Sequence, residues 1–273
     1  MKLYFALASN KPDNEAIFES SSQNYLFSYH YYKTELQKSR IIDWGLIDNK
    51  DLFLDSGAFS AFTLKKEINI DEYIEYIKDL DVKIYANLDV IGDSEATVEN
   101  ELYMKSKDLT PLPVFHLGEP IYYLDRILNS NCSYFALGGM VQSQNLDGWL
   151  VNVWEHIYRK RPNIKVHGFG LTNINLMIKY PWYSCDSSSW ASGVRFGRFS
   201  EWNPIKGLFI QKEVKEIFNK NGIDYENREP IINEKRQFII KEQVNQFLEA
   251  EKWVNIKASS FDYNYLKQQT KLF

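Results

Sequence analysis

The sequence of 273 residues predicts an α/β fold, a single (β/α)8 barrel of the TIM type with a C-terminal helical extension. Short apolar segments alternate with helical segments, which is the pattern of parallel βαβ units. There are eight such apolar segments, and most of them end in a polar residue or a glycine. Eight strands in a chain of this length favour a closed barrel over an open sheet.

The composition excludes several classes of protein. Hydrophobic residues make up 44% of the chain and aromatic residues 15%, as in a globular protein with a large core. The net charge of −4 argues against a generally basic nucleic-acid coat but allows a local basic groove. Cys132 and Cys185 form no CxxC pair and have no clustered histidines, so we expect neither a disulfide framework nor a structural zinc site. Without a segment of transmembrane length, the protein is expected to be cytoplasmic and not bound to a membrane.

The predicted strands are apolar runs of the length that suits buried parallel strands. The first covers residues 3–8, and the second clear one covers residues 52–55. The aromatic segment 25–32 is compatible with either strand or helix. The remaining predicted strands cover residues 83–89, 112–116, 133–137, 164–168, 181–185 and 193–198.

Helices are predicted between the strands. The clearest begins at Asn69 and carries Tyr73, Ile74, Ile77 and Leu80 at the spacing of one buried face. The other predicted helices of the barrel cover residues 34–48, 93–107, 120–129, 145–160 and 173–179.

The last part of the chain is predicted to be helical. Residues 204–220 are expected to form the helix after the barrel, and residues 233–254 a helix that packs against its outside. We therefore assign residues 1–225 to the barrel and residues 226–273 to the C-terminal extension.

Asp55 ends an apolar run and is followed at once by Ser56 and Gly57, where the chain must turn. Asp55 alone would be explained as a helix cap. However, ligands bind at the carboxyl ends of barrel strands, and several other predicted strands end in similar residues. These residues are Asp89, His116, Gly138, Gly139, His167, Gly168 and Asp186. We therefore predict a functional site at this end of the barrel.

Three carboxylates at one rim have two natural uses. They bind a metal, here with His116 and His167 as further ligands, or they divide acid, base and nucleophile roles in covalent chemistry. The sequence has no HxH or HExxH motif. A lone histidine at the end of an apolar strand is more often a hydrogen-bonded core residue than a ligand. The covalent interpretation is therefore preferred, with no metal and no cofactor.

Residues 54–59, Leu-Asp-Ser-Gly-Ala-Phe, resemble the DSGGFQ signature of the tRNA-guanine transglycosylases. These enzymes are (β/α)8 barrels that exchange a guanine for a 7-deazaguanine. Further segments resemble the family in the same order, over roughly residues 50 to 200. They are 87–89 (NLD), 137–140 (LGGM), 185–186 (CD) and 195–198 (RFGR).

The sequence departs from the family pattern at three points. Ser60 replaces the final glutamine of the signature, and His116 stands about where a recognition glutamine is expected. No cysteine follows Cys185, so the family's zinc subdomain, which helps to hold tRNA, is absent. The chain therefore resembles more closely the compact phage and bacterial proteins that place 7-deazaguanines in DNA.

The resemblance implies a role for each residue. Asp186 would be the nucleophile that traps the sugar, and Asp55 the general acid and base. Asp89 would accept hydrogen bonds from the donor edge of a guanine-like base, while Arg195 and Arg198 would hold phosphates. The other implied substrate-binding residues are Ser56, Gly57, Phe59, His116, Gly138, Gly139, His167 and Gly168.

The predicted function is thus the replacement of guanine by a 7-deazaguanine in DNA, through a covalent bond between Asp186 and the sugar. The expected partners are DNA and the deazaguanine base, and a homodimer is left open. Three alternatives remain: a transglycosylase acting on tRNA, a metal-dependent barrel hydrolase, and a nucleic-acid-binding barrel without catalysis. The three aspartates argue against the last, because a groove that only binds phosphates has no reason to keep acids.

Overall fold

The computed structural model describes residues 1–49, 51–140, 146–224 and 233–258 of the chain. Within them, eight parallel strands form one sheet in the order β4-β3-β2-β1-β8-β7-β6-β5. Its two outer strands also meet, because Ala86 and Leu112 form a parallel bridge and Leu112 N donates to Tyr85 O at 2.8 Å. The sheet is thereby closed, and the predicted (β/α)8 barrel is confirmed. The strands are β1 (Lys2–Ala6), β2 (Asn24–Ser28), β3 (Asp51–Asp55), β4 (Ile84–Tyr85), β5 (Val114–His116), β6 (Tyr134–Gly138), β7 (Lys165–Gly168) and β8 (Ser184–Ser187).

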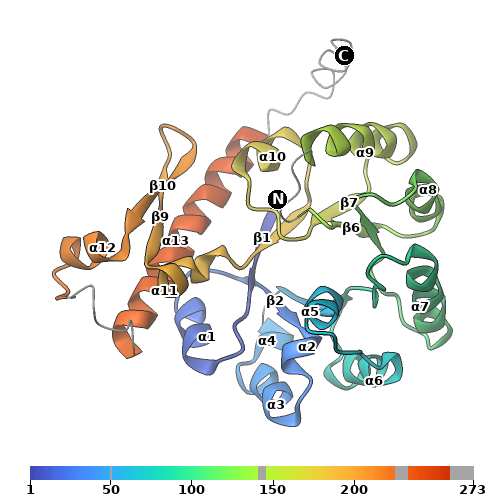
Figure 1. Cartoon of the computed structure of the whole chain (residues 1–273), viewed down its shortest axis with the longest axis horizontal. Helices are drawn as coiled ribbons and strands as arrows, with labels where there is room; N and C mark the ends of the chain where they lie inside the picture. The colour runs from blue at the N-terminus through green and yellow to red at the C-terminus, as the bar shows by residue number, and fades with distance from the viewer. Residues whose placement is uncertain (50, 141–145, 225–232, 259–273) are drawn as a thin grey trace.

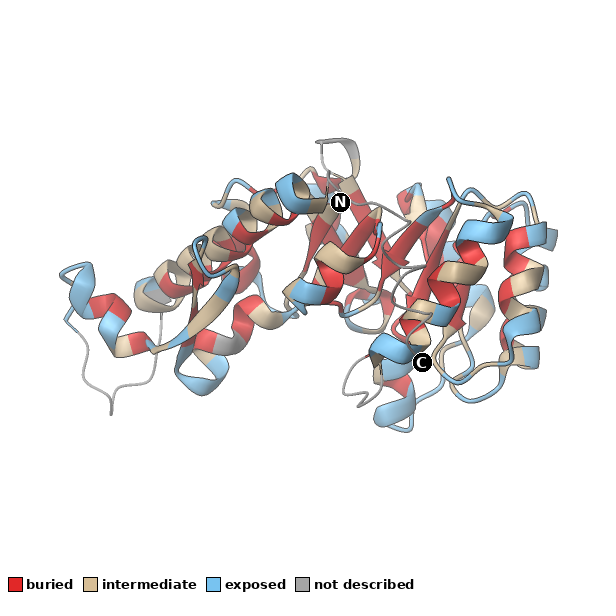
Figure 2. Ribbon diagram, turned by 90° about the horizontal axis from the view of Figure 1, so that it is seen from above, coloured by how far each residue is buried: buried red, intermediate tan, exposed pale blue. Residues whose placement is uncertain are grey.

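Helices surround the sheet, and their apolar faces cover it (Figures 1 and 2). The predicted helix beginning after Asn69 is α6 (Ile70–Leu80). The side chain of Asn69 accepts from two backbone N–H groups of its first turn, and Tyr73, Ile74 and Ile77 are buried as predicted. The other helices around the barrel are α1 (Lys11–Phe18), α2 (Tyr29–Tyr32), α3 (Glu35–Asp43), α4 (Leu46–Asn49), α5 (Ala58–Thr63), α7 (Ser94–Ser106), α8 (Ile121–Asn129), α9 (Leu146–Lys160) and α10 (Ile174–Lys179). None of the helices in the described ranges has an apolar stretch long enough to cross a bilayer.

Two strand predictions need correction. The ambiguous segment 25–32 contains both structures, because β2 ends at Ser28 and α2 begins at Tyr29. This segment completes the ring of eight strands, so no place remains for a strand at 193–198. That prediction is wrong: a 3₁₀ turn, η1 (Ser189–Ala191), and the helix α11 (Ser192–Phe196) follow β8. Trp190 anchors this turn, since it is buried and donates its indole N–H to Ala6 O at 2.9 Å.

The chain after α11 forms a separate antiparallel hairpin, β9 (Arg198–Asn203) and β10 (Leu208–Glu213). The predicted helix over 204–220 is therefore wrong in its first half, where residues 208–213 pair with 198–203. Only its second half is helical, as α12 (Val214–Lys220). The predicted domain boundary between residues 225 and 226 lies outside the described residues.

The predicted C-terminal helix is confirmed as α13 (Asn233–Ala258) and packs on the outside of the barrel (Figure 1). Glu251 accepts from Leu3 N at 2.8 Å, and Asn255 accepts from the N-terminal amine at 2.7 Å. Gln243 exchanges two hydrogen bonds of 2.9 Å with the backbone of Ser200 in β9. The helix therefore connects the hairpin to the first barrel strand.

The barrel interior is a small buried cluster separate from the larger core between sheet and helices. Its buried members are Tyr4, Leu26, Phe53, Ala86, Leu112, Val114 and Ala136. Side chains alternate along a strand, so the residue two positions after each of these faces the same way. This alternation decides which side chains meet at the carboxyl ends of the strands.

Candidate active site

Three of the predicted site residues stand two positions after an inward-facing residue of the barrel. Asp55 follows Phe53, His116 follows Val114, and Gly138 follows Ala136. Asp186 stands at the same level of β8, two residues after Ser184. The strands therefore direct these residues to the carboxyl end of the barrel interior, as the sequence predicted.

Asp55 ends β3 and lies close enough to Asp186 and Asp89 to be influenced by both charges. Burial, and then the charges of Asp186 and Asp89, raise the pKa of Asp55 to about 7. Gly57 N donates to its Oδ2 at 3.1 Å. Gly57 itself is the N-cap of α5, so Asp55 does not act as the cap of that helix. Asp55 can therefore bind and release a proton near neutral pH.

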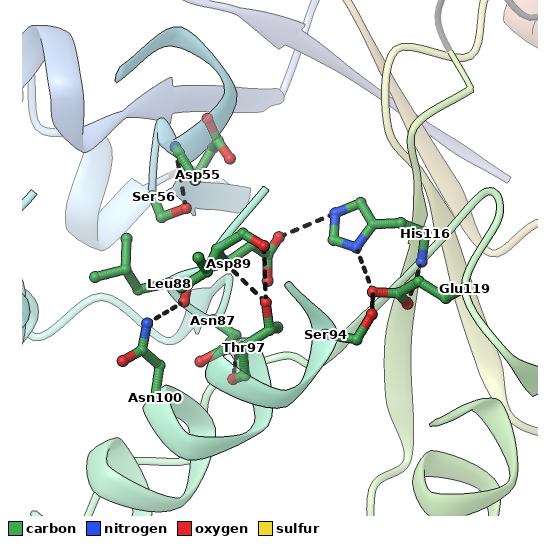
Figure 3. A network of polar contacts seen from close by, with 12 residues as sticks. Asp55, Ser56, Asn87, Leu88, Asp89, Ser94, Thr97, Asn100, His116 and Glu119 are labelled. Atoms are coloured by element: carbon green, nitrogen blue, oxygen red, sulfur yellow. Dashed lines mark hydrogen bonds and ion pairs between the residues drawn. The ribbon is translucent and has the colours of Figure 1, made fainter. Parts of the chain in front are cut away.

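Ser56 and Gly57 shape the turn after Asp55. Ser56 is buried, and its hydroxyl accepts from Ala58 N at 3.4 Å (Figure 3). Gly57 has φ of 77°, and a Cβ at this position would lie 2.4 Å from the Cβ of His30. A side chain does not fit there, so the glycine serves the close approach of this turn to the end of β2.

Asp89 lies in the loop after β4, which α7 holds in place (Figure 3). Asn100 donates to Leu88 O at 2.8 Å, and Val90 N donates to the hydroxyl of Thr97 at 2.8 Å. The sequence did not predict a role for Asn100 or Thr97, because that role depends on a contact between helix and loop. Their bonds fix the backbone on both sides of Asp89.

His116 joins Asp89 to a fourth carboxylate, Glu119 (Figure 3). His116 Nε2 is 3.3 Å from Asp89 Oδ2, and Nδ1 is 3.5 Å from Glu119 Oε1. Burial alone would lower the pKa of His116, but the hydrogen bonds to Asp89 and Glu119 outweigh it and raise the pKa to about 10. His116 is therefore a cation at neutral pH, held between two acids.

Glu119 was not predicted from the sequence, although it lies in the segment that follows His116. Gly118 has φ of 92°, which turns the chain so that Glu119 Oε2 accepts from His116 N at 2.8 Å. Glu119 Oε1 accepts from the hydroxyl of Ser94 at 2.7 Å. One feature of the sequence could have indicated this contact: Glu119 stands three residues after His116, and Gly118 lies between them.

Asp89 retains an unsatisfied acceptor. Its side chain is 10% exposed, and among the described residues its Oδ1 is buried without a hydrogen-bond partner. The same holds for Oδ1 of Asn87, whose amide nitrogen donates to Thr97 O at 2.9 Å. A buried acceptor without a partner costs roughly 1–3 kcal/mol. A ligand that presents N–H groups would recover this cost.

Asp186 is oriented by two neighbours. Its Oδ1 accepts from Gly170 N at 2.8 Å and lies 3.3 Å from His167 Nε2. Both contacts involve Oδ1, and no hydrogen bond to Oδ2 is seen among the described residues. The other ring nitrogen of His167 is 2.7 Å from the Ser184 hydroxyl, which lies 2.5 Å from the hydroxyl of Tyr134. A chain of polar contacts thus runs from Asp186 into the barrel.

The side chain of His167 is closed off from solvent. It is 0% exposed and packs edge-on against the rings of Phe53 and Phe169, whose centroids are each 4.7 Å from the centroid of the imidazole ring. His167 contacts the carboxylate cluster through Asp186. Gly168 is also buried, and a Cβ there would lie 3.0 Å from the ring of Trp182, so this glycine serves packing.

Gly138 and Gly139 follow each other at the end of β6. A Cβ on Gly138 would lie 2.6 Å from Cδ2 of His116, so the glycine makes room for that ring. Gly139 is exposed and has φ of 72°, which makes its backbone accessible at the rim.

The remaining predicted residues lie outside the carboxylate cluster. Phe59 is 68% exposed on α5, immediately after the Asp55 turn. Arg195 and Arg198 are exposed on α11 and at the start of β9, in the segment after the last barrel strand. In the described part of the chain, no group of three or more His, Cys, Asp or Glu residues is arranged to hold a metal ion.

Comparison with known proteins adds no assignment. No protein-family model matches the chain, and no curated protein matches it.

Proposed function

We propose that the protein is a transglycosylase that replaces guanine with a 7-deazaguanine in DNA. The observation that carries this proposal is the different surroundings of two adjacent carboxylates. Asp186 is oriented through one oxygen, whereas burial and neighbouring charge raise the pKa of Asp55 to about 7. Base exchange needs one carboxylate as nucleophile and another as proton carrier.

In the first step, Oδ2 of Asp186 attacks C1′ of the sugar while the bond from C1′ to N9 of guanine breaks. The electron pair of that bond passes to the base, and protonated Asp55 supplies the proton that makes guanine a neutral leaving group. A covalent ester between Asp186 and the sugar remains, and Asp55 is now ionised. The transition state is cationic at the sugar, which the nearby carboxylates stabilise.

In the second step, Asp55 accepts the proton from N9 of the incoming 7-deazaguanine. N9 then attacks C1′, and the ester bond to Asp186 breaks with its electron pair returning to the carboxylate. Two displacements at C1′ give retention of configuration, and both carboxylates return to their starting states.

Base selection in this proposal belongs to Asp89 and His116. Asp89 presents a buried acceptor without a partner among the described residues, which suits the N1–H and 2-amino donors of a guanine-like base. His116 contributes by holding Asp89 in place, since its two ring nitrogens face Asp89 and Glu119. DNA is proposed over tRNA because residues 186–273 contain no cysteine that could bind zinc as in the tRNA enzymes.

The test is incorporation of radiolabelled guanine and 7-cyano-7-deazaguanine into duplex DNA, single-stranded DNA and bulk tRNA in parallel. Label in DNA is the expected result, and label in tRNA alone would move the proposal to RNA. Asp186→Ala should lose at least about 10⁴-fold in rate, because the covalent step is removed. Asp79→Ala, at an exposed acid, is the matched control and should keep full activity.

A second measurement looks for the covalent ester directly. Wild-type protein mixed with labelled oligonucleotide should give a complex that survives denaturation, and Asp186→Asn should bind the oligonucleotide without forming it. No label in any polymer and no covalent complex would overturn the proposal.

A further inference from the structure

Two exposed phenylalanines lie on α5, directly after the turn that carries Asp55. Phe59 is 68% exposed and Phe62 is 60% exposed, whereas Ala58 and Ala61 of the same helix are buried. Residues three apart lie on one face of a helix, so the two rings stand side by side. Scattered exposed apolar residues are ordinary, but a pair of aromatic rings beside a functional site indicates a contact surface.

Three lysines follow the ends of α5 and of a helix packed against it. Lys33 follows α2, which packs against α5 (Figure 1), and Lys65 and Lys66 follow α5. All three are exposed, and none forms an ion pair with any residue in the described ranges. The sequence contains no Asp or Glu at 28–34 or 56–66. We call Lys33, Phe59, Phe62, Lys65 and Lys66 the aromatic–lysine surface.

The aromatic–lysine surface is close to the catalytic cluster. Lys66 and Lys33 lie near enough to His30 that, after burial, their charges lower its pKa. His30 in turn packs against the Gly57 turn, whose backbone N–H binds Asp55. Phosphate groups on these lysines would therefore lie one side chain away from the acid–base residue.

The neighbouring part of the rim, after β4, which pairs with β3, has the opposite charge. The loop between β4 and α7 carries Asp89 and Asp93, and Glu95 lies in the first turn of α7. Glu119 lies in the neighbouring loop before α8. A polyanion is repelled from that side, whereas the hydrogen-bond donors of a base are attracted to it. The charge distribution therefore favours the phosphates of a nucleotide at the lysines and its base at the acidic residues.

We propose that the aromatic–lysine surface binds the strand of single-stranded or locally unpaired DNA next to the target nucleotide. Lys33, Lys65 and Lys66 contact its phosphates, and Phe59 and Phe62 stack on a neighbouring base. Stacking on exposed aromatic rings together with lysine contacts to the backbone is the usual way in which proteins hold single strands. This inference rests on the proposed function for its choice of partner, and it adds where the strand lies.

The experiment is binding of a fluorescein-labelled single-stranded DNA oligonucleotide, measured by fluorescence anisotropy over a range of salt concentrations. Phe59→Ala/Phe62→Ala should weaken binding by about fivefold or more, as expected when one base no longer stacks. Lys33→Ala/Lys66→Ala should weaken binding and reduce the slope of log K against log salt by about 0.7 for each phosphate that the variant no longer neutralises. Lys78→Ala, at an exposed lysine of α6 outside the surface, is the matched control and should bind as wild type.

Thermal denaturation of each variant separates loss of binding from loss of fold. Folded surface variants that bind DNA as tightly as Lys78→Ala would overturn the inference, even if base exchange is observed. Failure of the exchange assay with intact, surface-dependent binding would overturn the proposed function and leave the surface as a nucleic-acid contact. The two proposals therefore fail on different measurements.

Discussion

Asp55 and Asp186 have the same side chain, but neighbouring residues give them different chemistry. Asp55 is buried near two further carboxylates, and both the burial and the charges raise its pKa to near neutral pH. Asp186 meets a backbone N–H and a buried imidazole, both of which contact Oδ1. In the proposed reaction, the first environment suits proton transfer, and the second suits a nucleophile whose direction is fixed.

The titration of Asp55 should appear in the stability of the protein. Folding raises its pKa from 3.8 to about 7, so the native state holds this proton more tightly than the unfolded chain does. Its contribution to stability is therefore present at acidic pH and is lost as the pH rises to about 7. Relative to Asp55→Asn, the wild-type free energy of unfolding should fall by roughly 3 kcal/mol between pH 4 and 7 and stay level above it.

Urea denaturation of both proteins at several pH values measures this difference. Asp79→Asn, at an exposed acid, should show no such pH-dependent difference from wild type. Parallel curves for wild type and Asp55→Asn would show that the pKa of Asp55 is not raised by folding.

His167 should act as a positioning residue for Asp186. His167→Ala should reduce kcat by about 10²-fold with little change in KM, because the nucleophile loses its orientation while the groups that touch the substrate stay in place. His167→Gln keeps a side-chain N–H near Oδ1 and should restore part of kcat. Single-turnover kinetics of base exchange would measure both, and a raised KM with normal kcat would assign His167 to substrate binding.

Among the secondary-structure elements, those with a clear period were predictable and those defined by their neighbours were not. The face of α6 follows from the spacing of Tyr73, Ile74 and Ile77 alone. In contrast, the aromatic segment 25–32 fits strand and helix equally well by pattern, and the segment 193–198 was predicted as a strand but is largely helical. Their structures depend on which strand completes the ring, and this is decided by contacts distant in the sequence.

The same distinction applies to the site. Asp55 and Asp186 were predictable because each follows an apolar run and a barrel collects such ends at one rim. Ser94 and Tyr134 were not, because their hydrogen-bond partners lie on other elements, and Glu119 was missed although His116 stands only three residues before it. The burial of His167 was also not predicted. The alternation of side chains along β7 indicates which face of the sheet His167 is on, but not whether other side chains cover it.

The turn between β3 and α5 gives a prediction for a single glycine. Gly57→Ala should lower the free energy of unfolding by more than about 1 kcal/mol, because φ of 77° strains any side chain and the new Cβ meets His30 at 2.4 Å. Gly222→Ala is the control, since its φ of 70° brings the same backbone strain but nothing lies within 4 Å. Chemical denaturation should show Gly57→Ala as clearly the less stable variant, and equal stability would mean that the contact with His30 relaxes freely.

The whole molecule is held together by α13, which reaches from the hairpin to the N-terminal strand. Arg236 on this helix makes a bidentate ion pair with Asp13 of α1, whose side chain is 4% exposed. The pair joins the first and last helices around the barrel, so it links segments that are far apart in the sequence.

Removing one partner of this pair should be costly. Arg236→Ala leaves the buried carboxylate of Asp13 without its cation and should reduce the free energy of unfolding by about 3–5 kcal/mol. Asp13→Asn/Arg236→Met removes both charges and should recover most of that loss. Urea denaturation distinguishes them, and a single variant as stable as wild type would mean that water replaces the arginine.

The junction between β4 and β5 gives the barrel one weak link. Seven neighbouring pairs of strands are joined by ladders, whereas this pair is joined by one bridge between Ala86 and Leu112. Asp89 follows β4 and His116 ends β5, so their ion pair connects the two strands that only one bridge joins. A ligand that contacts both residues would bridge β4 and β5, and its binding would then stabilise the closed barrel at this junction.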